Sequence, residues 1–321
     1  MRLCVLLLAL PFALKAQAAP AVASHTPEQL ITERRLDEAK TIIDAMLASD
    51  KNDPKAMYYR GRLEYALGNS GRAVDWFEKA VKRNDTSAVY HLWLGNALGD
   101  EAQKASKLRQ PFLARRVKGE FERAVALDPK SIDAREGLVG FYSVAPGFMG
   151  GSMDKARDQA NEILKLDVIR GNFQLARVAE RSKDTVAAEA AYKAVISTAP
   201  DSAIGYYGLG GFYRNRSRWD EAFATYEQLM RRKPDEMPVH LTWAATAAQS
   251  GKNLERGETE AKFYLANAKD APPVNLSSAH WRLGQIYEKT SRRDLANAEY
   301  SEALKINPQN QNARRSLDAL K

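Results

Sequence analysis

Cysteine is almost absent from this sequence. The only one, Cys4, lies in an apolar run at the N-terminus, too close to the start of the chain to be a lipidation site at the end of a signal. Without that run the chain has no thiol, which excludes disulfides, a thiolate nucleophile and a cysteine-based metal site. The packing of side chains must therefore stabilise the fold.

Long hydrophobic runs are also missing. The apolar stretch at residues 3–14 is shorter than the roughly 20 residues that a membrane-spanning helix needs. It follows Arg2 and precedes Ala16, Gln17 and Ala18, a pattern typical of a cleavable secretory signal. We expect cleavage after Ala18, with residues 21–23 as a second candidate site, and export to the bacterial periplasm. A retained membrane anchor is the alternative.

Catalytic signatures are lacking as well. The sequence contains no H-E-x-x-H zinc motif, no G-x-S-x-G nucleophile elbow and no G-x-x-x-x-G-K-S/T phosphate loop. We therefore predict that the chain is not an enzyme and that it binds no cofactor and no metal. A role as an enzyme accessory subunit is kept as an alternative of another class.

The charge is moderately basic, with 48 Lys and Arg against 40 Asp and Glu. Removing residues 1–18 takes away Arg2 and Lys15 and no acidic residue, which leaves a net charge of +6. No nucleic-acid-binding module accompanies this charge, so we expect no nucleic-acid partner. An exported basic chain instead meets anionic envelope polymers, lipid head groups or acidic proteins.

An internal repeat organises the sequence. The clearest copy consists of Tyr206, Leu209, Gly210, Tyr213, Ala222, Tyr226, Leu229 and Pro234. A second copy has the same spacing and consists of His280, Leu283, Gly284, Tyr287, Ala296, Tyr300, Ala303 and Pro308. Small residues at the glycine and alanine positions allow two antiparallel helices to approach closely, and the proline ends the unit. This pattern resembles the tetratricopeptide repeat (TPR).

The resemblance implies an all-α TPR solenoid of about eight antiparallel helix pairs in a right-handed superhelix. Weaker copies place this array at residues 19–321, after a signal peptide at residues 1–18. The repeats are expected at residues 26–53, 54–86, 87–130, 131–168, 169–202, 203–236, 237–273 and 274–310, with a C-terminal capping helix at residues 311–321.

Two insertions depart from the repeat. Gly95 and Phe121 are 26 residues apart, whereas the equivalent Gly210 and Tyr226 are 16 apart. The extra ten residues predict two lengthened helices interrupted near Pro111. The inserted segment contains Lys104, Lys107, Arg109, Arg115, Arg116 and Lys118. These residues form either a solvated basic face or a docking surface for an acidic partner.

The second insertion is a glycine-rich loop at residues 145–152. Its apolar residues, Phe148 and Met149, are expected to fold back onto the neighbouring helices, and a recognition loop is the alternative. The two insertions together resemble a subgroup of exported bacterial TPR proteins with no defined enzymatic activity.

Three of the four histidines, His91, His240 and His280, stand four residues before the small residue of a first helix. This shared position indicates that they replace a packing aromatic side chain and do not bind metal.

The TPR resemblance also implies a binding groove lined by the first helix of each pair. Transferring the family's register gives eleven groove candidates: Tyr58, Arg62, Leu92, Asn96, Phe173, Arg177, Tyr207, Arg214, Trp281, Gln285 and Lys289. Alternating aromatic and basic side chains suit an extended peptide with carboxylates or carbonyls exposed. We predict a scaffold for a protein or peptide, with an acidic partner as one candidate. The alternatives are that some of these rings belong to the core, or that they stack on envelope polysaccharide or peptidoglycan.

Overall fold

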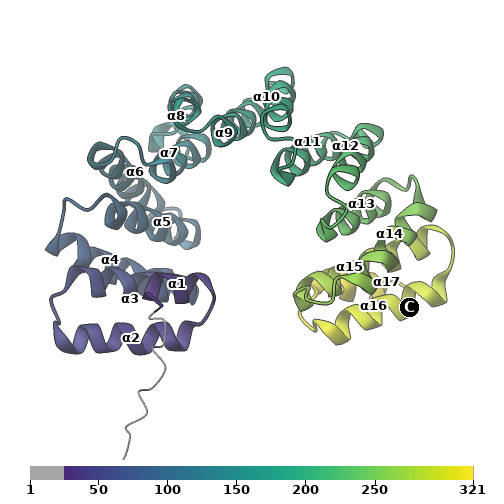
Figure 1. The fold of residues 1–321 in the computed structure, drawn as a ribbon, viewed down its shortest axis with the longest axis horizontal. Helices are drawn as coiled ribbons and strands as arrows, with labels where there is room; N and C mark the ends of the chain where they lie inside the picture. The colour runs from purple at the N-terminus through teal and green to yellow at the C-terminus, as the bar shows by residue number, and fades with distance from the viewer. Residues whose placement is uncertain (1–24, 321) are drawn as a thin grey trace, which may run out of the picture. The chain divides into compact units, whose positions relative to one another are not determined.

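The computed structural model describes residues 25–320, and the expected signal peptide lies outside these residues. Within them the chain is all-helical (Figure 1). The helices are α1 (Pro27–Thr32), α2 (Leu36–Ser49), α3 (Pro54–Ala66), α4 (Ser70–Arg83), α5 (Ala88–Lys104), α6 (Gln110–Leu127), α7 (Ile132–Val144), the 3-10 helix η1 (Gly147–Met149), α8 (Met153–Leu166), α9 (Val168–Arg181), α10 (Thr185–Thr198), α11 (Ala203–Asn215), α12 (Trp219–Arg232), α13 (Met237–Ser250), α14 (Leu254–Asn267), α15 (Pro273–Lys289), α16 (Arg293–Ile306) and α17 (Gln311–Ala319).

Successive helices pack as pairs, from α1 with α2 and α3 with α4 to α15 with α16, and the single helix α17 follows, which confirms the predicted solenoid of helix pairs with a C-terminal helix. The chain divides into two compact units, unit 1 at residues 1–101 and unit 2 at residues 102–321. In unit 2 the first helices α7, α9, α11, α13 and α15 follow one another on one side, and α8, α10 and α12 lie on the other (Figure 1).

One contact recurs in both units: an aromatic ring of a second helix packs where a glycine leaves the first helix bare. A Cβ atom on Gly61 would lie 2.5 Å from the ring of the fully buried Phe77. The same position on Gly284 would lie 2.5 Å from the ring of Tyr300. Each ring therefore occupies the space that a larger residue on the first helix would need.

Other aromatic rings of second helices reach the next pair in unit 2. A Cβ atom on Gly137 of α7 would lie 2.5 Å from Phe121 of α6, and one on Gly208 of α11 would lie 2.7 Å from Tyr192 of α10. Aromatic rings of second helices thus fill space both within a pair and between successive pairs. One core cluster of unit 2 accordingly continues across three pairs, from Ala176 of α9 to Ala247 of α13.

Most first helices end in the same turn. After α11, Ser217 adopts a positive φ of 57° and Arg218 N–H donates to the Tyr213 carbonyl at 2.9 Å. The same carbonyl also accepts from Arg216 N–H at 3.0 Å, so both bonds help to close the end of the helix. The equivalent left-handed residues after α1, α3, α9 and α15 are Arg34, Gly68, Lys183 and Ser291. The repeated turn sets the antiparallel course of each second helix.

The first insertion lengthens α5 and α6, as predicted. Pro111 stands in the first turn of α6, where the absence of an N–H costs nothing, so the interruption falls just before it at residues 105–109.

The glycine-rich loop differs from its prediction. Phe148 is 82% exposed, so the expectation that it folds back onto the helices is wrong, whereas Met149 is partly buried. The backbone explains the difference. Gly151 N–H donates to the Pro146 carbonyl at 3.1 Å, and a Cβ atom on Gly151 would meet the carbonyl oxygen of Ala145. The loop is closed by its own backbone contacts and holds Phe148 outward.

A pair of adjacent glycines tests the ring-on-glycine contact. In Gly210→Ala the new Cβ would lie 2.3 Å from the ring of Tyr226, and we expect overpacking to lower the free energy of unfolding by about 1–3 kcal/mol. Gly211→Ala is the matched control, because nothing lies within 4 Å of its Cβ position. This control should be neutral or more stable by up to about 1 kcal/mol. Urea unfolding checks both, and equal stability of the two variants would contradict the role of the contact.

A second test concerns the acid stability of unit 2. The hydrogen bond from Lys193, with those from Arg218 and Tyr213, lowers the pKa of Glu189 from 4.5 to about 2. Because the folded-state pKa is below the unfolded value, this stabilisation is complete above pH 4.5 and is lost as the pH falls towards 2. Glu189→Gln should cost about 1–2 kcal/mol at pH 7, and the difference from wild type should shrink near pH 2.

Urea midpoints at the two pH values provide the measurement. Glu302→Gln is the control, because its exposed side chain contacts Lys305 at the surface and should leave stability unchanged. A Glu189→Gln penalty of equal size at both pH values would show that packing, not charge, explains the effect.

Candidate functional site

Two of the groove candidates in unit 1 belong to the core. Tyr58 is 7% exposed and its ring stacks on Tyr90 at 5.0 Å between centroids, and Leu92 is 9% exposed. Their assignment to an open groove is therefore wrong. Both stand three residues before the small residue of a first helix, and in this unit that position faces a dense aromatic cluster.

The two other candidates of unit 1 are partly buried. Arg62 is already occupied, because its guanidinium forms an ion pair with Glu28, donates to the Tyr58 hydroxyl at 2.9 Å and lies 3.5 Å from the Trp93 ring centroid. Asn96 is the second. A side chain with as many partners as Arg62 serves the packing of α1 on α3 more than the capture of a ligand.

In unit 2 the aromatic candidates are half-buried and fixed. The Tyr207 hydroxyl donates to Glu236 Oε1 at 3.2 Å, and burial together with the charge of Glu236 raises the pKa of Tyr207. Trp281 Nε1 donates to Ser316 Oγ of the capping helix at 3.1 Å. Phe173 packs edge-on against Tyr192. These rings have one face in the core, which makes them rigid.

The basic candidates Arg177 and Arg214 of unit 2 have no carboxylate partner among the described residues. Arg177 is exposed and Arg214 is partly buried, and within residues 25–320 neither side chain makes an ion pair or a hydrogen bond. Arginines at the starts of second helices behave differently: Arg218 bonds Glu189 at 2.5 Å and Arg292 bonds Glu258 at 2.5 Å. The first helices of unit 2 thus carry guanidinium groups that no described carboxylate pairs with.

Arg282 is a third member of this set that the sequence analysis missed. Its guanidinium lies 3.9 Å from the Trp281 ring centroid and donates to Gln285 Oε1 at 2.9 Å, but no described carboxylate pairs with it. Burial and the nearby charge of Arg214 lower the pKa of Arg282 to about 10. Its place between the candidates Trp281 and Gln285 was the available signal.

Two like charges with no counter-ion are unfavourable where water is partly excluded. An anionic group brought by a ligand would relieve this cost at Arg214 and Arg282, and guanidinium geometry suits a carboxylate. Gln285 orients Arg282, while the remaining candidate Lys289 is exposed at the end of α15. We call Arg177, Arg214 and Arg282 the arginine set.

The histidines connect helices. His240 Nδ1 lies 2.5 Å from Glu260 Oε2, and His280 Nδ1 lies 2.7 Å from Glu299 Oε2, each within its own pair. His91 is buried and its Nε2 lies 3.0 Å from the Asp85 carbonyl. No group of three or more His, Cys, Asp or Glu that could hold a metal ion occurs in the described part of the chain.

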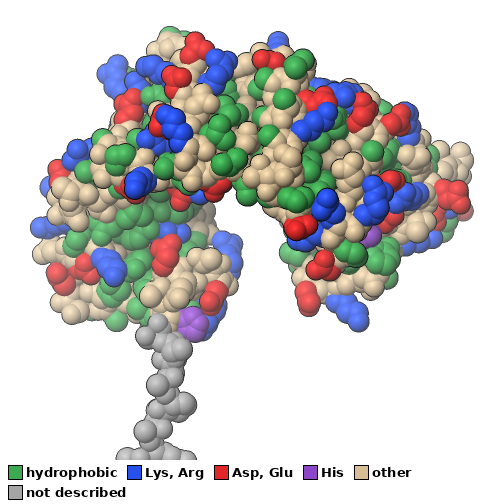
Figure 2. All heavy atoms as spheres, turned by 45° about the horizontal axis from the view of Figure 1, so that its top comes forward, with side chains coloured by type: hydrophobic (Ala, Val, Ile, Leu, Met, Phe, Trp, Pro, Cys, Tyr) green, Lys and Arg blue, Asp and Glu red, His purple; other side chains and the backbone are tan. Residues whose placement is uncertain are grey.

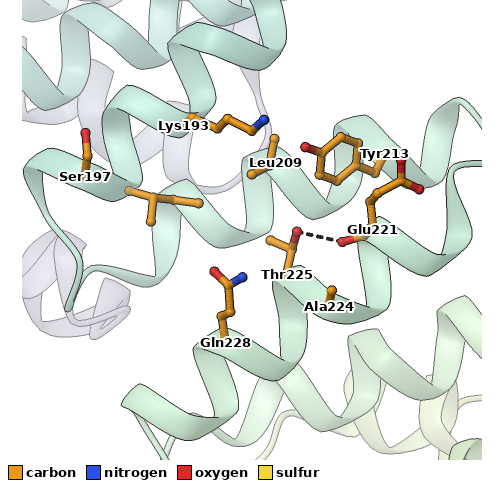
Figure 3. Close-up of a pocket in the computed structure, with 9 residues that line it drawn as sticks. Lys193, Ser197, Leu209, Tyr213, Glu221, Ala224, Thr225 and Gln228 are labelled. Carbon is orange, nitrogen blue, oxygen red and sulfur yellow. Dashed lines mark hydrogen bonds between the residues drawn. The ribbon is translucent and has the colours of Figure 1, made fainter.

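A depression between α10 and α12 lies on the other side of unit 2 (Figure 3). Its rim carries Lys193, Tyr213 and Glu221, and Thr225 Oγ1 donates to the Glu221 carbonyl at 2.7 Å. Lys193 and Glu221 are already paired with Glu189 and Arg218. This depression therefore offers a ligand less unpaired charge than the arginine set does. No helix among residues 25–320 is both long and apolar enough to cross a membrane.

Comparison with known proteins gives a consistent result. One tetratricopeptide-repeat model matches residues 30–88 and 173–236, and a second matches residues 277–310. No curated protein matches the chain.

Solved structures with this fold include three informative examples. Yeast Tom70 aligns with a TM-score of 0.66 at 14% identity, covering 90% of this chain and 58% of that one. The chain thus spans little more than half of the Tom70 structure. A tetratricopeptide-repeat protein of Parabacteroides merdae aligns with a TM-score of 0.52 at 13% identity, covering 83% of this chain and 98% of that one.

A human IFIT1 dimer with PPP-AAAA aligns with a TM-score of 0.52 at 18% identity, covering 91% of this chain and 70% of that one. Identities this low establish the fold alone. The matched repeats and the shared helical fold together show that the chain belongs to the tetratricopeptide-repeat family.

Proposed function

We propose that the chain is an exported scaffold that holds a protein or an extended peptide against the first helices of unit 2. The observation that carries this proposal is the arginine set, which has no described carboxylate partner although most charged neighbours on the second helices are paired. Export is inferred from Arg2, the apolar run after it and the small residues Ala16 and Ala18.

The chemistry of the site favours a peptide ligand. Phe173, Tyr207 and Trp281 supply rigid apolar area, which binds side chains at a low entropic cost. Arg177, Arg214 and Arg282 supply donors for carboxylates or backbone carbonyls. An extended acidic segment lying along α9, α11 and α15 would satisfy both groups. Tetratricopeptide-repeat proteins typically bind proteins or peptides on extended surfaces of their stacked helices, which supports a binding role.

Selection from a displayed library of random peptides tests this function. Peptides enriched on the wild-type chain should contain acidic residues, and Arg177→Ala with Arg214→Ala should weaken their binding at least roughly tenfold, about 1.4 kcal/mol, by fluorescence anisotropy. Neither side chain makes an ion pair or a hydrogen bond in the described structure, so unfolding in urea should be unchanged. Arg231→Ala on the second helix α12 is the matched control and should bind as wild type does.

Two outcomes would contradict the proposal. One is a library from which no peptide is enriched, and the other is an enriched peptide that binds the double variant as tightly as wild type. Co-sedimentation with purified peptidoglycan in the absence of any enriched peptide would favour the polysaccharide alternative.

A further inference from the structure

The inserted segment at α5 and α6 carries exposed apolar side chains, and all of its charged residues are basic. Leu108 is 85% exposed and Phe112 is 73% exposed, while residues 102–118 contain six basic residues and no acidic one. Over the face seen in Figure 2, by contrast, basic and acidic side chains are interspersed. The segment therefore combines exposed large apolar side chains with charge of a single sign.

The backbone places these side chains on one side of α6. Arg109 and Gln110 N–H both donate to the Ser106 carbonyl, at 2.9 and 3.1 Å, and Arg109 has right-handed helical angles. The helical course therefore begins before α6 itself. Residues four and seven apart share a helix face, so Leu108, Phe112 and Arg115 point the same way.

The opposite face of α6 is the one that packs. Its buried residues, Ala114, Val117 and Phe121, stand about half a turn away from Leu108 and Phe112. The apolar side chains thus face outward although α6 already has a packed face. Lys107, Arg109 and Arg115 beside them are exposed and make no ion pair in the described structure. We call Lys107, Leu108, Arg109, Phe112 and Arg115 the insertion face.

The glycine-rich loop adds a third apolar side chain near this helix. Its short helix η1 packs against α6, and Gly150 lies beside the Lys118 side chain. The loop is held by its own hydrogen bonds, and Phe148 projects from it with 82% exposure. Both insertions therefore place outward apolar residues at the same helix.

We propose that the insertion face binds the surface of an anionic lipid bilayer. Lys107, Arg109 and Arg115 would lie among anionic head groups, and Leu108 and Phe112 would enter the boundary with the acyl chains. The charge alone suits an acidic protein equally well. The exposed apolar side chains favour a bilayer over an acidic protein. A bilayer accepts separate projecting side chains without a shaped pocket, whereas a protein partner must supply a pocket complementary to them.

This proposal is independent of peptide binding, because the arginine set and the insertion face share no residue. It also differs from a membrane-spanning anchor, because insertion reaches only the interfacial layer.

Co-sedimentation of the full chain with vesicles tests the insertion face. Wild type should bind vesicles of equal parts phosphatidylglycerol and phosphatidylcholine, release them at high salt, and bind pure phosphatidylcholine poorly. Leu108→Ser with Phe112→Ser should weaken binding roughly tenfold or more. Arg109→Gln with Arg115→Gln should weaken it about fivefold for each cation removed. All variants keep the same N-terminus, so differences between them report the insertion face alone.

Two control variants match these changes elsewhere in unit 2. Val186→Ser removes a 79% exposed apolar side chain from α10, and Arg231→Gln with Lys305→Gln removes two exposed charges. Both controls should bind as wild type does, and urea midpoints should be equal for all variants. The proposal is overturned if wild type ignores the anionic vesicles or if the insertion-face variants bind like the controls. Binding to polyglutamate but not to vesicles would identify an acidic-protein interface instead.

Discussion

The fold depends on a single repeated contact, the packing of an aromatic ring from a second helix over a glycine on a first helix. Gly61 with Phe77 and Gly284 with Tyr300 show it in the two units. The contact fixes how closely two helices approach, because the ring fills the space that a Cβ would occupy. Where a ring of a second helix meets a glycine of the next pair, as Tyr192 meets Gly208, it fixes the step from one pair to the next.

Because the fold depends on this contact, the helix pairs could be predicted from the sequence. Spacing between Gly210 and Tyr226 is set by helix geometry, so a pattern of residue types was enough to predict the pairs and the capping helix. Exposure of single side chains was harder to predict. Tyr58 and Tyr207 hold equivalent positions, yet Tyr58 is in the core because Tyr90 stacks on it, and Tyr207 is partly open. That difference depends on neighbours from another pair, which periodicity does not contain.

Charge is distributed by a similar rule. Glu189 receives hydrogen bonds from Lys193, Arg218 and Tyr213, so a carboxylate of one pair is linked to the next pair. Such ion pairs involve most of the charged side chains on the second helices and in the turns. In the sequence only its place between Trp281 and Gln285 pointed to Arg282, since the lack of a carboxylate partner is a property of its surroundings in the fold. Its lowered pKa has a physical cause, burial beside Arg214, that only the packed helices create.

The features to which we assign binding are therefore departures from the repeat. A perfect array would pair every charge and bury every ring, and would leave little for a ligand to satisfy. The arginine set departs by lacking counter-ions, whereas Leu108, Phe112 and Phe148 depart by facing outward from inserted segments. The ring-on-glycine contacts hold the helices without help from these residues. The side chains of these residues can therefore vary with the ligand without loss of the fold. The proposed charged contacts and the ring-on-glycine contacts thus rest on different side chains, and each set can be altered while the effect on the other is measured.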